Sequence, residues 1–559
     1  MKEKYLITSA LPYANGVLHF GHLAGAYLPA DVFARFKRMM GDDVLYICGS
    51  DEYGVAITLS AEMAGRTPKE HVDIFHEINK NLFARLGMTF DHYSRTTWSG
   101  HAQPVQQFFL DLLNNGYIEE KVTNQLFSEQ DQKFLADRYV CGICPKCHKD
   151  DARGDECPYC GASYEATDLI NPRSKITGST LSLKATKHWF LRFDLFKEEL
   201  LEWLGKKHWK PNIVNFVEGY IRDLKPRAIT RDGEWGVKIP LANTEGKVLY
   251  VWFDAPIGYI TATQEWAKTQ EDHEVWKKYW LDEKTKLINF VGKDNIPFHA
   301  IFFPAMCMGQ NTPYKLVDEI PANEFLNLEG KQFSKSAGWT IDMEEFLEEF
   351  SPDQIRYTLA ANAPENADSE FTWHDFQMRC NSELVGKLGN LVNRTLVFNQ
   401  KHCGMRVPKL GILEEIDHEF LANISACVNQ AKLAYEQFSL RRATLAIMEL
   451  CGFANAYFDA KKPWSDAKTL ETKPRMETTI YCCLEALKLL ALISSPIIPT
   501  GAGEIFNMLN IKQRSSWHDV VAYRFEHDHH LLEPKILFTK VEDSVIQAQI
   551  EKLHSMLKI

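Results

Sequence analysis

No stretch of this 559-residue sequence is apolar for long enough to cross a membrane. The longest candidate, Leu489 to Pro499, is shorter than the ~20 residues of a membrane span and contains two prolines, so we interpret it as the end of a buried helix. The N-terminus argues against a signal peptide, because it meets Pro12 and Asn15 where an apolar segment would be needed. These absences predict a cytoplasmic protein.

The sequence also has no excess of positive charge. Its 63 lysines and arginines are outnumbered by 74 aspartates and glutamates, which gives a formal net charge of −11. That balance excludes a general nucleic-acid coat protein, because such proteins neutralise many phosphates. It leaves room for a large ligand that touches only local basic patches, such as Lys206 to His208 or Lys461 and Lys462.

The sequence contains no internal repeats and no low-complexity tracts. Its composition, with 45% hydrophobic and 25% charged residues, is typical of a globular protein. A chain of this length exceeds what one hydrophobic core supports, so we expect ~3 to 4 folding units. The 13 cysteines, in a protein expected to be cytoplasmic, indicate metal ligands and buried thiols rather than disulfides.

Strand-like and helical segments alternate in two parts of the chain. Tyr5–Thr8 reads as a strand, Leu23–Met40 as an amphipathic helix and Asp43–Cys48 as a second strand. This β-α-β order predicts a parallel sheet whose ligands bind at the carboxyl ends of its strands, where the loop Gly49 to Gly54 lies. A second such stretch comprises the strand-like segments Val248–Phe253 and Leu287–Val291 and a helix from Pro297 to Gly309.

The segments around these two α/β parts have a different character. Residues 117–230 are rich in Cys, Gly, Asp and turn signals, as expected of an insertion that splits a nucleotide-binding fold. From about residue 375 onward, apolar residues recur at helical spacing, through 384–400, 417–439, 441–461 and 476–494. We therefore predict an α/β fold with a Rossmann-like parallel sheet, split by the insertion and followed by an α-helical bundle domain.

Four cysteines in the insertion have the spacing of a metal site. Two Cys-x-x-Cys pairs, Cys144 with Cys147 and Cys157 with Cys160, are separated by nine residues. Such paired knuckles predict one closed tetrathiolate zinc site, which is structural because it leaves no open coordination position. His148 is an alternative ligand, and so is Cys141, which we exclude because it would break the symmetric pairing.

Two further motifs suit phosphate chemistry. His19, Gly21 and His22 stand where the first strand gives way to a helix, so backbone N–H groups and two imidazoles surround one small volume. The loop Lys331 to Gly338 carries Lys335 between two serines and resembles a mobile phosphate clamp. Taken alone, the histidine motif is equally compatible with an ordinary turn, and the isolated lysine loop is better explained by a solvated turn.

Together these motifs resemble the paired signatures of class I aminoacyl-tRNA synthetases. Four features narrow the resemblance to the methionyl-tRNA synthetases, of the bacterial type with a single four-cysteine zinc knuckle. They are the turn Ala10-Leu-Pro-Tyr-Ala-Asn-Gly16, the cysteine knuckles, the segment Val251-Trp-Phe-Asp-Ala-Pro-Ile-Gly-Tyr259 and the segment Val291-Gly-Lys-Asp294. The resemblance implies ATP-dependent attachment of methionine to elongator and initiator tRNA(Met), through a methionyl-adenylate and with release of AMP and pyrophosphate.

The resemblance also implies roles for individual residues. His19 and His22, with Gly21 between them, would bind ATP at its α-phosphate, and Lys335 would neutralise the β- and γ-phosphates, helped by Mg²⁺ bound to ATP. Asp51 would anchor the α-ammonium of methionine. The other residues of the methionine pocket would be Ala10, Leu11, Tyr13, Trp252, Ala255, Pro256, Tyr259 and His299. From spacing alone, Trp252 and Tyr259 are better explained by core packing, and only the resemblance favours the pocket.

The helical bundle resembles the family's anticodon-binding domain. Asn390 and Arg394 share a helix face, and Trp464 follows Pro463 at the start of another helical run. These side chains suit recognition of the CAU anticodon, because aromatic rings stack on unstacked bases and polar groups read their edges. Without the resemblance, a surface arginine and a half-buried tryptophan explain them.

The chain departs from the family pattern at several positions. Gln332 replaces the first lysine of the phosphate loop, and Asn295 and Phe303 stand where the family often has a larger apolar residue and a tryptophan. The dimer-forming domain that many relatives carry after such a C-terminal segment is absent, so we expect a monomer. The alternatives are a sibling class I synthetase for another amino acid and a non-catalytic tRNA-binding or zinc-ribbon protein.

The motifs divide the chain into six segments. We expect the first and second halves of the catalytic domain at 1–116 and 231–322, and the zinc-bearing insertion at 117–230. The remaining segments are the phosphate loop with a stem-contact region at 323–385, the anticodon-binding domain at 386–540 and a tail at 541–559.

Overall fold

The computed structural model describes residues 2–130, 133–135, 139–154, 157, 159–160, 164, 166–334, 338–511 and 516–556. Lys335, predicted to bind the phosphates of ATP, lies outside the described residues. No helix of the described chain is both long and apolar enough to cross a membrane.

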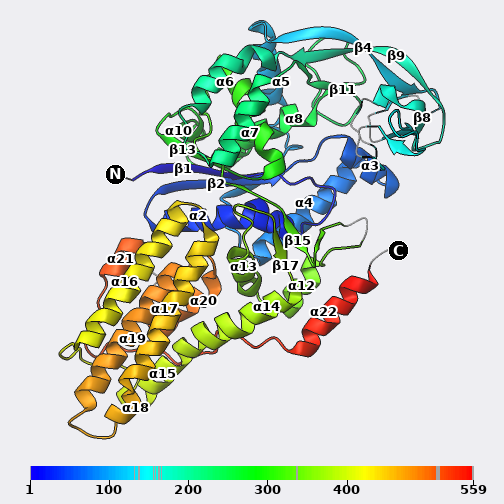
Figure 1. Ribbon diagram of the computed structural model, residues 1–559. Helices are drawn as coiled ribbons and strands as arrows, with labels where there is room; N and C mark the ends of the chain where they lie inside the picture. Colours follow the sequence, from blue (N-terminus) through cyan, green and yellow to red (C-terminus); the bar gives the residue numbers. More distant parts are fainter. Residues whose placement is uncertain are drawn as a thin grey trace.

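A five-stranded sheet with the order β14-β13-β1-β2-β3 lies at the centre of the molecule (Figure 1). All four strand pairs are parallel, and β1 lies between β13 and β2, with Lys4 opposite both Thr285 and Asp43. This pairing confirms the predicted split sheet, since β13 comes from the second α/β part of the sequence. The strands are β1 Lys4–Ser9, β2 Asp43–Ser50, β3 His92–Arg95, β13 Thr285–Gly292 and β14 Ala322–Asn323.

The chain returns from β1 to β2 through a mostly buried helical segment. It begins as α1, Phe20–His22, continues as a π-helical stretch, Leu23–Tyr27, and ends as α2, Leu28–Met39. The predicted helix over 23–40 is therefore present, with a π-helical first turn. The other helices around the sheet are α3 Val55–Met63, α4 Pro68–Arg85, α5 Ala102–Asn114, α9 Gly258–Ala267, α10 Lys277–Trp280 and α11 Phe303–Met308.

One predicted strand is largely wrong. Only Lys247–Leu249 forms a strand, β12, which pairs with β11, Thr230–Asp232, and Val251–Asp254 is the short helix α8. A short apolar run fits a buried helical turn as well as a strand, because both hide every side chain. The consequence is that Trp252 and Asp254 lie on a helical turn near the end of the sheet.

The insertion forms a long antiparallel ribbon and a small sheet. β4, Ile118–Ser128, pairs with β9, Leu181–Leu191, along its full length (Figure 1). The small sheet has the order β7-β6-β8 and carries the cysteine segment; its strands are Ala152–Arg153, Val140–Ile143 and Ile170–Ser174. β5, Lys133–Phe134, and β10, Arg227–Ala228, extend the ribbon, and α6, Lys197–Leu204, packs against α7, Pro211–Arg222.

A connecting region follows the second half of the sheet. The strands β15 Leu326–Leu328, β16 Lys331–Gln332 and β17 Ser369–Phe371 form a small sheet. The helices are α12 Met343–Glu349, α13 Pro352–Ala361 and α14 Trp373–Met378, which continues into a π-helical stretch, Arg379–Gly389. This region leads from the sheet into the helical domain (Figure 1).

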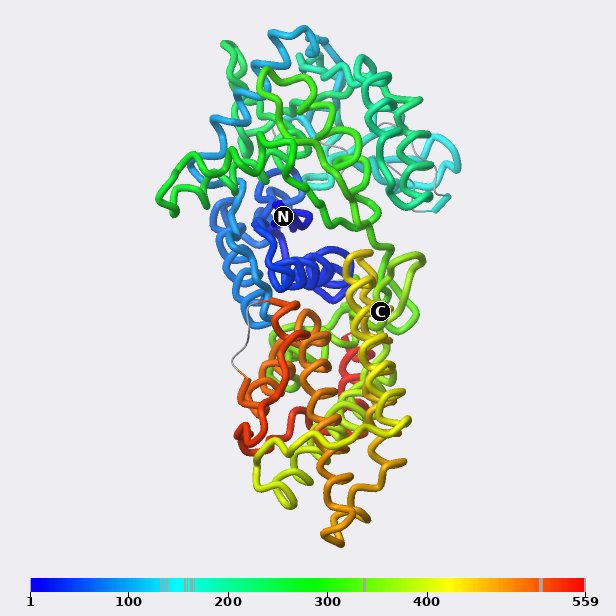
Figure 2. Tube along the Cα trace, turned by 90° about the vertical axis from the view of Figure 1, so that its left-hand side faces the viewer, coloured from blue at the N-terminus to red at the C-terminus, as the bar shows by residue number. Residues whose placement is uncertain are grey.

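The C-terminal part is helical in all its described elements, which confirms the predicted bundle. Its helices are α15 Asn390–Cys403, α16 Glu415–Glu436, α17 Leu440–Lys461, α18 Pro463–Asp466, α19 Lys473–Ser494, α20 Pro499–Met508, α21 Trp517–Ala522 and α22 Asp543–Ser555. Figure 2 shows this domain as an elongated body on one side of the sheet, opposite the insertion.

The two parts of the molecule share one core. The guanidinium of Arg356 is buried between them: Nη2 lies 2.7 Å from Asp31 on α2, and the Pro496 and Ile497 carbonyls of the helical domain accept further hydrogen bonds. Phe36 of α2 also packs on Tyr435 of α16. A buried ion pair that loses one partner leaves an uncompensated charge, so this contact fixes the helical domain against the sheet.

Candidate active site and metal centre

The turn after β1 is tied to the end of β2. The Asp51 N–H donates to the Pro12 carbonyl at 2.8 Å, and the Ala14 N–H donates to the Asp51 carbonyl at 2.9 Å. This bridge puts Tyr13 beside Asp51 at the carboxyl end of two neighbouring parallel strands. Such an edge is where open α/β sheets bind their ligands.

His19 and His22 lie together at the start of α1. Their ring centroids are 3.7 Å apart, and the His19 N–H donates to His22 Nδ1 at 3.2 Å. A Cβ atom on Gly21 would lie 3.0 Å from the His19 ring, so this position favours glycine. The pair presents two imidazoles beside a helix N-terminus, a place suited to an anion.

Phe333 connects this pair to the second phosphate motif. Its ring stacks on His19, with centroids 4.6 Å apart and an interplanar angle of 2°. Two segments more than three hundred residues apart thus meet at the histidine turn, and Phe333 belongs to the predicted phosphate loop. Sequence reasoning missed Phe333, although it stands two residues before Lys335.

Aromatic rings line the region next to Asp51. Trp252 lies edge-on to Tyr13 at 6.2 Å between centroids and stacks on Phe298 at 3.6 Å with an interplanar angle of 12°. All three side chains are only partly buried. Phe298 was not predicted as a site residue, and the signal available was its place next to His299 in the same helical turn.

Tyr259 and His299 form a fixed polar pair in the same region. The Tyr259 hydroxyl lies 2.8 Å from His299 Nε2, and His299 Nδ1 lies 3.0 Å from the Asn295 carbonyl. Burial lowers the pKa of His299 to about 4, so the imidazole is neutral at pH 7. Because Nδ1–H then donates to the carbonyl, Nε2 accepts from the hydroxyl. The presence of Asn295 in place of a larger apolar residue does not affect this hydrogen bond, because the acceptor is the backbone carbonyl.

The remaining predicted pocket residues are small or apolar. The Ala10 carbonyl accepts a hydrogen bond from the Tyr27 hydroxyl at 2.9 Å. A Cβ atom on Gly258 would lie 3.0 Å from Leu11 Cδ1, so the glycine allows Leu11 to approach closely. Ala255 and Pro256 are buried in the turn between α8 and α9. Phe303, which stands where the family often has a tryptophan, is buried, and its ring centroid lies 6.3 Å from that of Trp280.

Asp51 is almost fully buried and has an unsatisfied oxygen. The residue is 2% exposed, and its Oδ1 has no hydrogen-bond partner among the described residues. Burial raises the pKa of this carboxyl well above its usual value, and the negative charge of the nearby Asp254 raises it further. The sequence motif contained Asp254, but sequence reasoning gave it no role. A cationic ligand group would relieve this arrangement.

The four predicted cysteines converge on one point. The Sγ atoms of Cys144 and Cys160 are 3.9 Å apart, those of Cys147 and Cys157 are 3.6 Å apart, and all four lie within 4.8 Å of one another. A tetrahedron of thiolates around Zn²⁺, with Zn–S bonds of ~2.3 Å, has edges of ~3.8 Å. The group can therefore hold a metal ion of that size. Among the described residues the cluster does not include Cys141 or His148.

The far end of the helical domain brings together two of the three predicted anticodon residues. The Arg394 guanidinium lies 4.2 Å above the Phe458 ring, and its Nη2 is 2.6 Å from Asp459 Oδ1. The Trp464 ring is 6.1 Å from that of Phe458 and is 43% exposed. Asn390 is exposed one turn before Arg394 on α15. Phe458 was missed because it reads as an ordinary core position.

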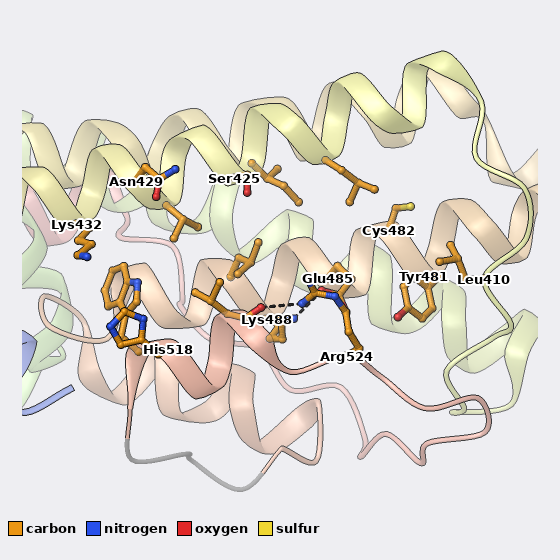
Figure 3. A pocket seen from close by; sticks show the side chains of 16 residues that line it. Leu410, Ser425, Asn429, Lys432, Tyr481, Cys482, Glu485, Lys488, His518 and Arg524 are labelled. Carbon is orange, nitrogen blue, oxygen red and sulfur yellow. Dashed lines mark hydrogen bonds and ion pairs between the residues drawn. The ribbon is translucent and has the colours of Figure 1, made fainter. Parts of the chain in front are cut away.

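A separate cavity of about 370 Å³ lies within the helical domain, away from the sheet (Figure 3). It is lined mostly by residues of α16, α19 and α21, and Figure 3 marks the ion pair of Lys488 with Glu485 among the lining side chains. Burial lowers the pKa of Lys488, while the carboxylate of Glu485 opposes that shift. None of the predicted site residues lines this cavity.

Comparisons with known proteins cover nearly the whole chain. Residues 5–396 match the family described as tRNA synthetases class I (M), and residues 407–556 match the anticodon binding domain of methionyl tRNA ligase. The methionine–tRNA ligase of Protochlamydia amoebophila is 62% identical over 559 residues, which are 100% of this chain and 80% of that protein. The corresponding ligase of Chlamydia abortus is 51% identical over 97% of this chain and 100% of its own length.

A solved structure agrees with these relatives. Mycobacterium tuberculosis methionyl-tRNA synthetase in complex with methionyl-adenylate superposes with a TM-score of 0.80 at 26% identity, over 96% of this chain and 100% of that one. The sequence families and the structural neighbour therefore lead to the same group of proteins.

Proposed function

The chain belongs to the class I methionyl-tRNA synthetases and joins methionine to tRNA at the expense of ATP, and we propose that the carboxyl edge of the sheet is its active site. The observations that carry the site are the bridge between Tyr13 and Asp51 at the ends of β1 and β2 and the His19–His22 pair at the start of the helical segment that follows β1. The alternative kept open by the motifs, a sibling synthetase for another amino acid, is not favoured, because the matched family and relatives are specific for methionine.

In the first step, the carboxylate of methionine attacks the α-phosphate of ATP and pyrophosphate leaves. We assign His19 and His22 to the α-phosphate, where their N–H groups stabilise the extra negative charge of the five-coordinate transition state. Lys335 takes the β- and γ-phosphates of the leaving group, together with the Mg²⁺ that accompanies ATP. Stacking of Phe333 on His19 supports this assignment, because it brings the two motifs to one place.

Methionine lies, in this proposal, between Asp51 and the aromatic wall. Asp51 receives the α-ammonium, and the thioether packs against the rings of Tyr13 and Trp252. The neutral Tyr259–His299 pair closes the pocket without adding a charge beside the sulfur. Ala10, Leu11, Ala255 and Pro256 complete the wall.

In the second step, the terminal ribose hydroxyl of tRNA attacks the methionyl-adenylate and releases AMP. We propose that the far end of the helical domain reads the CAU anticodon of elongator and initiator tRNA(Met). Trp464 offers a half-exposed ring on which a base can stack, and Arg394 is held over Phe458 beside it. Asn390 supplies an amide on the same face.

The four cysteines fit one zinc ion with a structural role. Four thiolates fill a tetrahedral shell, so no open position remains for catalysis. Cys144, Cys147, Cys157 and Cys160 would hold the ion and thereby fix the fold of the small sheet around β6.

The division of the chain into the six segments expected from the sequence remains part of this proposal, as does action in the cytoplasm. The monomeric state also remains a prediction, which light scattering of the purified protein tests directly.

Amino-acid-dependent exchange of pyrophosphate into ATP, measured with each of the twenty amino acids, tests the function. We expect exchange with methionine and, because rejection of an analogue that lacks one methyl group is worth only ~1–3 kcal/mol, weaker exchange with homocysteine. Exchange with leucine or cysteine but not methionine would contradict the substrate, and no exchange at all would contradict the reaction.

A further inference from the structure

A second aspartate is buried beside Asp51 and has no role in the mechanism above. Asp254 is 0% exposed and ends the helical turn α8, two residues after Trp252. No described side chain donates a hydrogen bond to either of its carboxylate oxygens or to Oδ1 of Asp51. The backbone N–H groups of Asp254 and Ala255 favour its ionised form, but no counter-charge does.

The described groups around this pair of aspartates supply no cation. In the loop after β2, the Glu52 carboxylate forms an ion pair with Arg95 at 2.8 Å. Burial raises the pKa of the neighbouring Tyr53, and the negative charge of Asp254 raises it further. His101, the residue just before α5, has its Nε2 atom 3.6 Å from Asp254 Oδ2, but burial lowers the pKa of His101 to about 3, so the ring is neutral. Tyr259, on α9, is neutral too.

Among the described residues, no lysine or arginine forms an ion pair with Asp51 or Asp254. Two buried carboxylates that interact electrostatically and have no paired cation do not both ionise near pH 7, since each charge is poorly solvated and repels the other. The free site therefore retains one proton near pH 7, which belongs to the pair because the two groups titrate as a unit.

We propose that Asp254 is the second carboxylate of the methionine-ammonium site, so that the substrate ammonium binds between Asp51 and Asp254 and displaces the proton they share. This inference rests on the proposed function, which makes Asp51 the anchor of that ammonium. No bond of the substrate breaks in this step: the ammonium keeps its three protons, both aspartates become carboxylates, and one proton passes to solvent.

The arrangement explains why two unpaired acids persist in the interior. An isolated buried charge costs several kcal/mol, but a cation that enters with the substrate compensates both carboxylates at once. The site then selects a positive charge as well as the shape of the thioether. An amino acid analogue without its amino group would leave the pair protonated and would displace nothing.

Calorimetric titration of the full-length protein with methionine, in two pH 7 buffers of different ionisation enthalpy, tests the proposal. We expect about one proton released per methionine, and therefore a methionine Kd that falls about tenfold per pH unit between pH 6 and 8. Asp254→Asn should abolish the release, flatten the pH dependence and raise the Kd at pH 8 about tenfold, as expected for a lost charge-assisted hydrogen bond.

Asp51→Asn separates this inference from the proposed function. If Asp51→Asn leaves methionine binding unchanged, the anchor itself is wrong and the proposed site fails. If Asp51→Asn weakens binding while Asp254→Asn keeps both the affinity and the proton release, only the inference is overturned. Asp353→Asn, at a buried aspartate on α13 that accepts from the Gly501 N–H, is the matched control and should bind methionine like the unmodified protein.

A measurement on the unmodified protein covers the case in which Asp254→Asn does not fold. Methioninol carries the ammonium, whereas 4-(methylthio)butan-1-ol differs from it only by lacking the amino group. Proton release with methioninol and none with the amine-free alcohol supports the proposal. Equal proton release with both, or none with methioninol, overturns it.

Discussion

The carboxyl edge of the sheet and the far end of the helical domain hold their charged side chains in opposite ways. At the sheet, Asp51 and Asp254 are 2% and 0% exposed, and no lysine or arginine in the described part of the chain forms an ion pair with either. At the helical end, Arg394 is only partly buried and already has Asp459 at 2.6 Å as its partner. A cationic ligand would therefore give the buried aspartates their first counter-charge. A ligand of Arg394 would instead have to replace Asp459 as the partner of the guanidinium.

From this difference in burial and pairing we infer that the two ends obtain their selectivity from different interactions. A desolvated carboxylate gains a strong interaction when a cation arrives, so its removal costs much affinity. A solvated arginine that exchanges one partner for another gains little, and stacking of bases on exposed rings then carries the binding. We therefore expect large effects of single substitutions at the sheet and smaller ones at the helical end.

The largest effect should come from the histidines at the sheet. His22→Asn should lower the kcat of methionine-dependent pyrophosphate exchange by about 10²–10³-fold, the usual loss when one donor to a developing anion is removed. The KM for methionine should change little, because the proposed role of His22 is at the α-phosphate of ATP and not at the amino acid. Steady-state exchange kinetics measure both values.

His418→Asn, at an exposed histidine on α16, is the control and should match the unmodified protein. A rise in the methionine KM with kcat preserved in His22→Asn would place the histidine in the amino-acid pocket and break the assignment.

The second largest effect concerns the buried carboxylate. Asp51→Asn should reduce kcat/KM for methionine about 10- to 100-fold, because a charge-assisted hydrogen bond of ~1.5–3 kcal/mol is lost. Exchange at varied methionine concentration measures the loss. If Asp353→Asn caused the same loss, general destabilisation rather than substrate contact would be the cause.

A smaller effect is expected at the helical end. Trp464→Ala should raise the KM for tRNA about tenfold, since stacking of one base on an aromatic ring is worth ~1–3 kcal/mol. Aminoacylation at varied tRNA concentration measures it. Phe453→Ala removes a similarly exposed ring (41%) from α17 and is the matched control. Equal losses in the two variants would remove the special role of Trp464.

The smallest effect on catalysis should follow loss of the metal. Cys157→Ser should abolish binding of one zinc per chain, measured by atomic absorption, and should make the small sheet around β6 sensitive to proteolysis. Pyrophosphate exchange should decline less than in Asp51→Asn, because the cysteines lie outside the proposed active site. A loss of exchange as large as that of His22→Asn would assign the metal a direct role.

The sequence was sufficient to predict the elements that have a regular periodicity or spacing. The parallel strands around β1, the helical domain and the four-cysteine group follow from periodicity and spacing, and the structure contains them. Sequence reasoning failed for the apolar run at 248–253, where a buried helical turn and a strand have the same composition. The residue-level roles assigned to the site came from family resemblance and remain predictions.

Three of the residues that sequence reasoning missed share one property. Phe298 and Phe333 act through stacking on Trp252 and His19, and Asp254 through its nearness to Asp51. Each contact joins segments that are far apart in the chain, so the local spacing of residues does not predict it. Only a folded structure brings such partners together.

The contrast between the two ends is tested most directly by methionine-dependent pyrophosphate exchange with Asp51→Asn and Trp464→Ala measured side by side. Because exchange requires no tRNA, we expect a loss of about 10- to 100-fold in kcat/KM for methionine in Asp51→Asn. We expect kcat/KM in Trp464→Ala to stay within about twofold of the unmodified protein, which is the range of an ordinary surface substitution. Comparable losses in both variants would contradict the assignment of Asp51 to methionine and of Trp464 to tRNA.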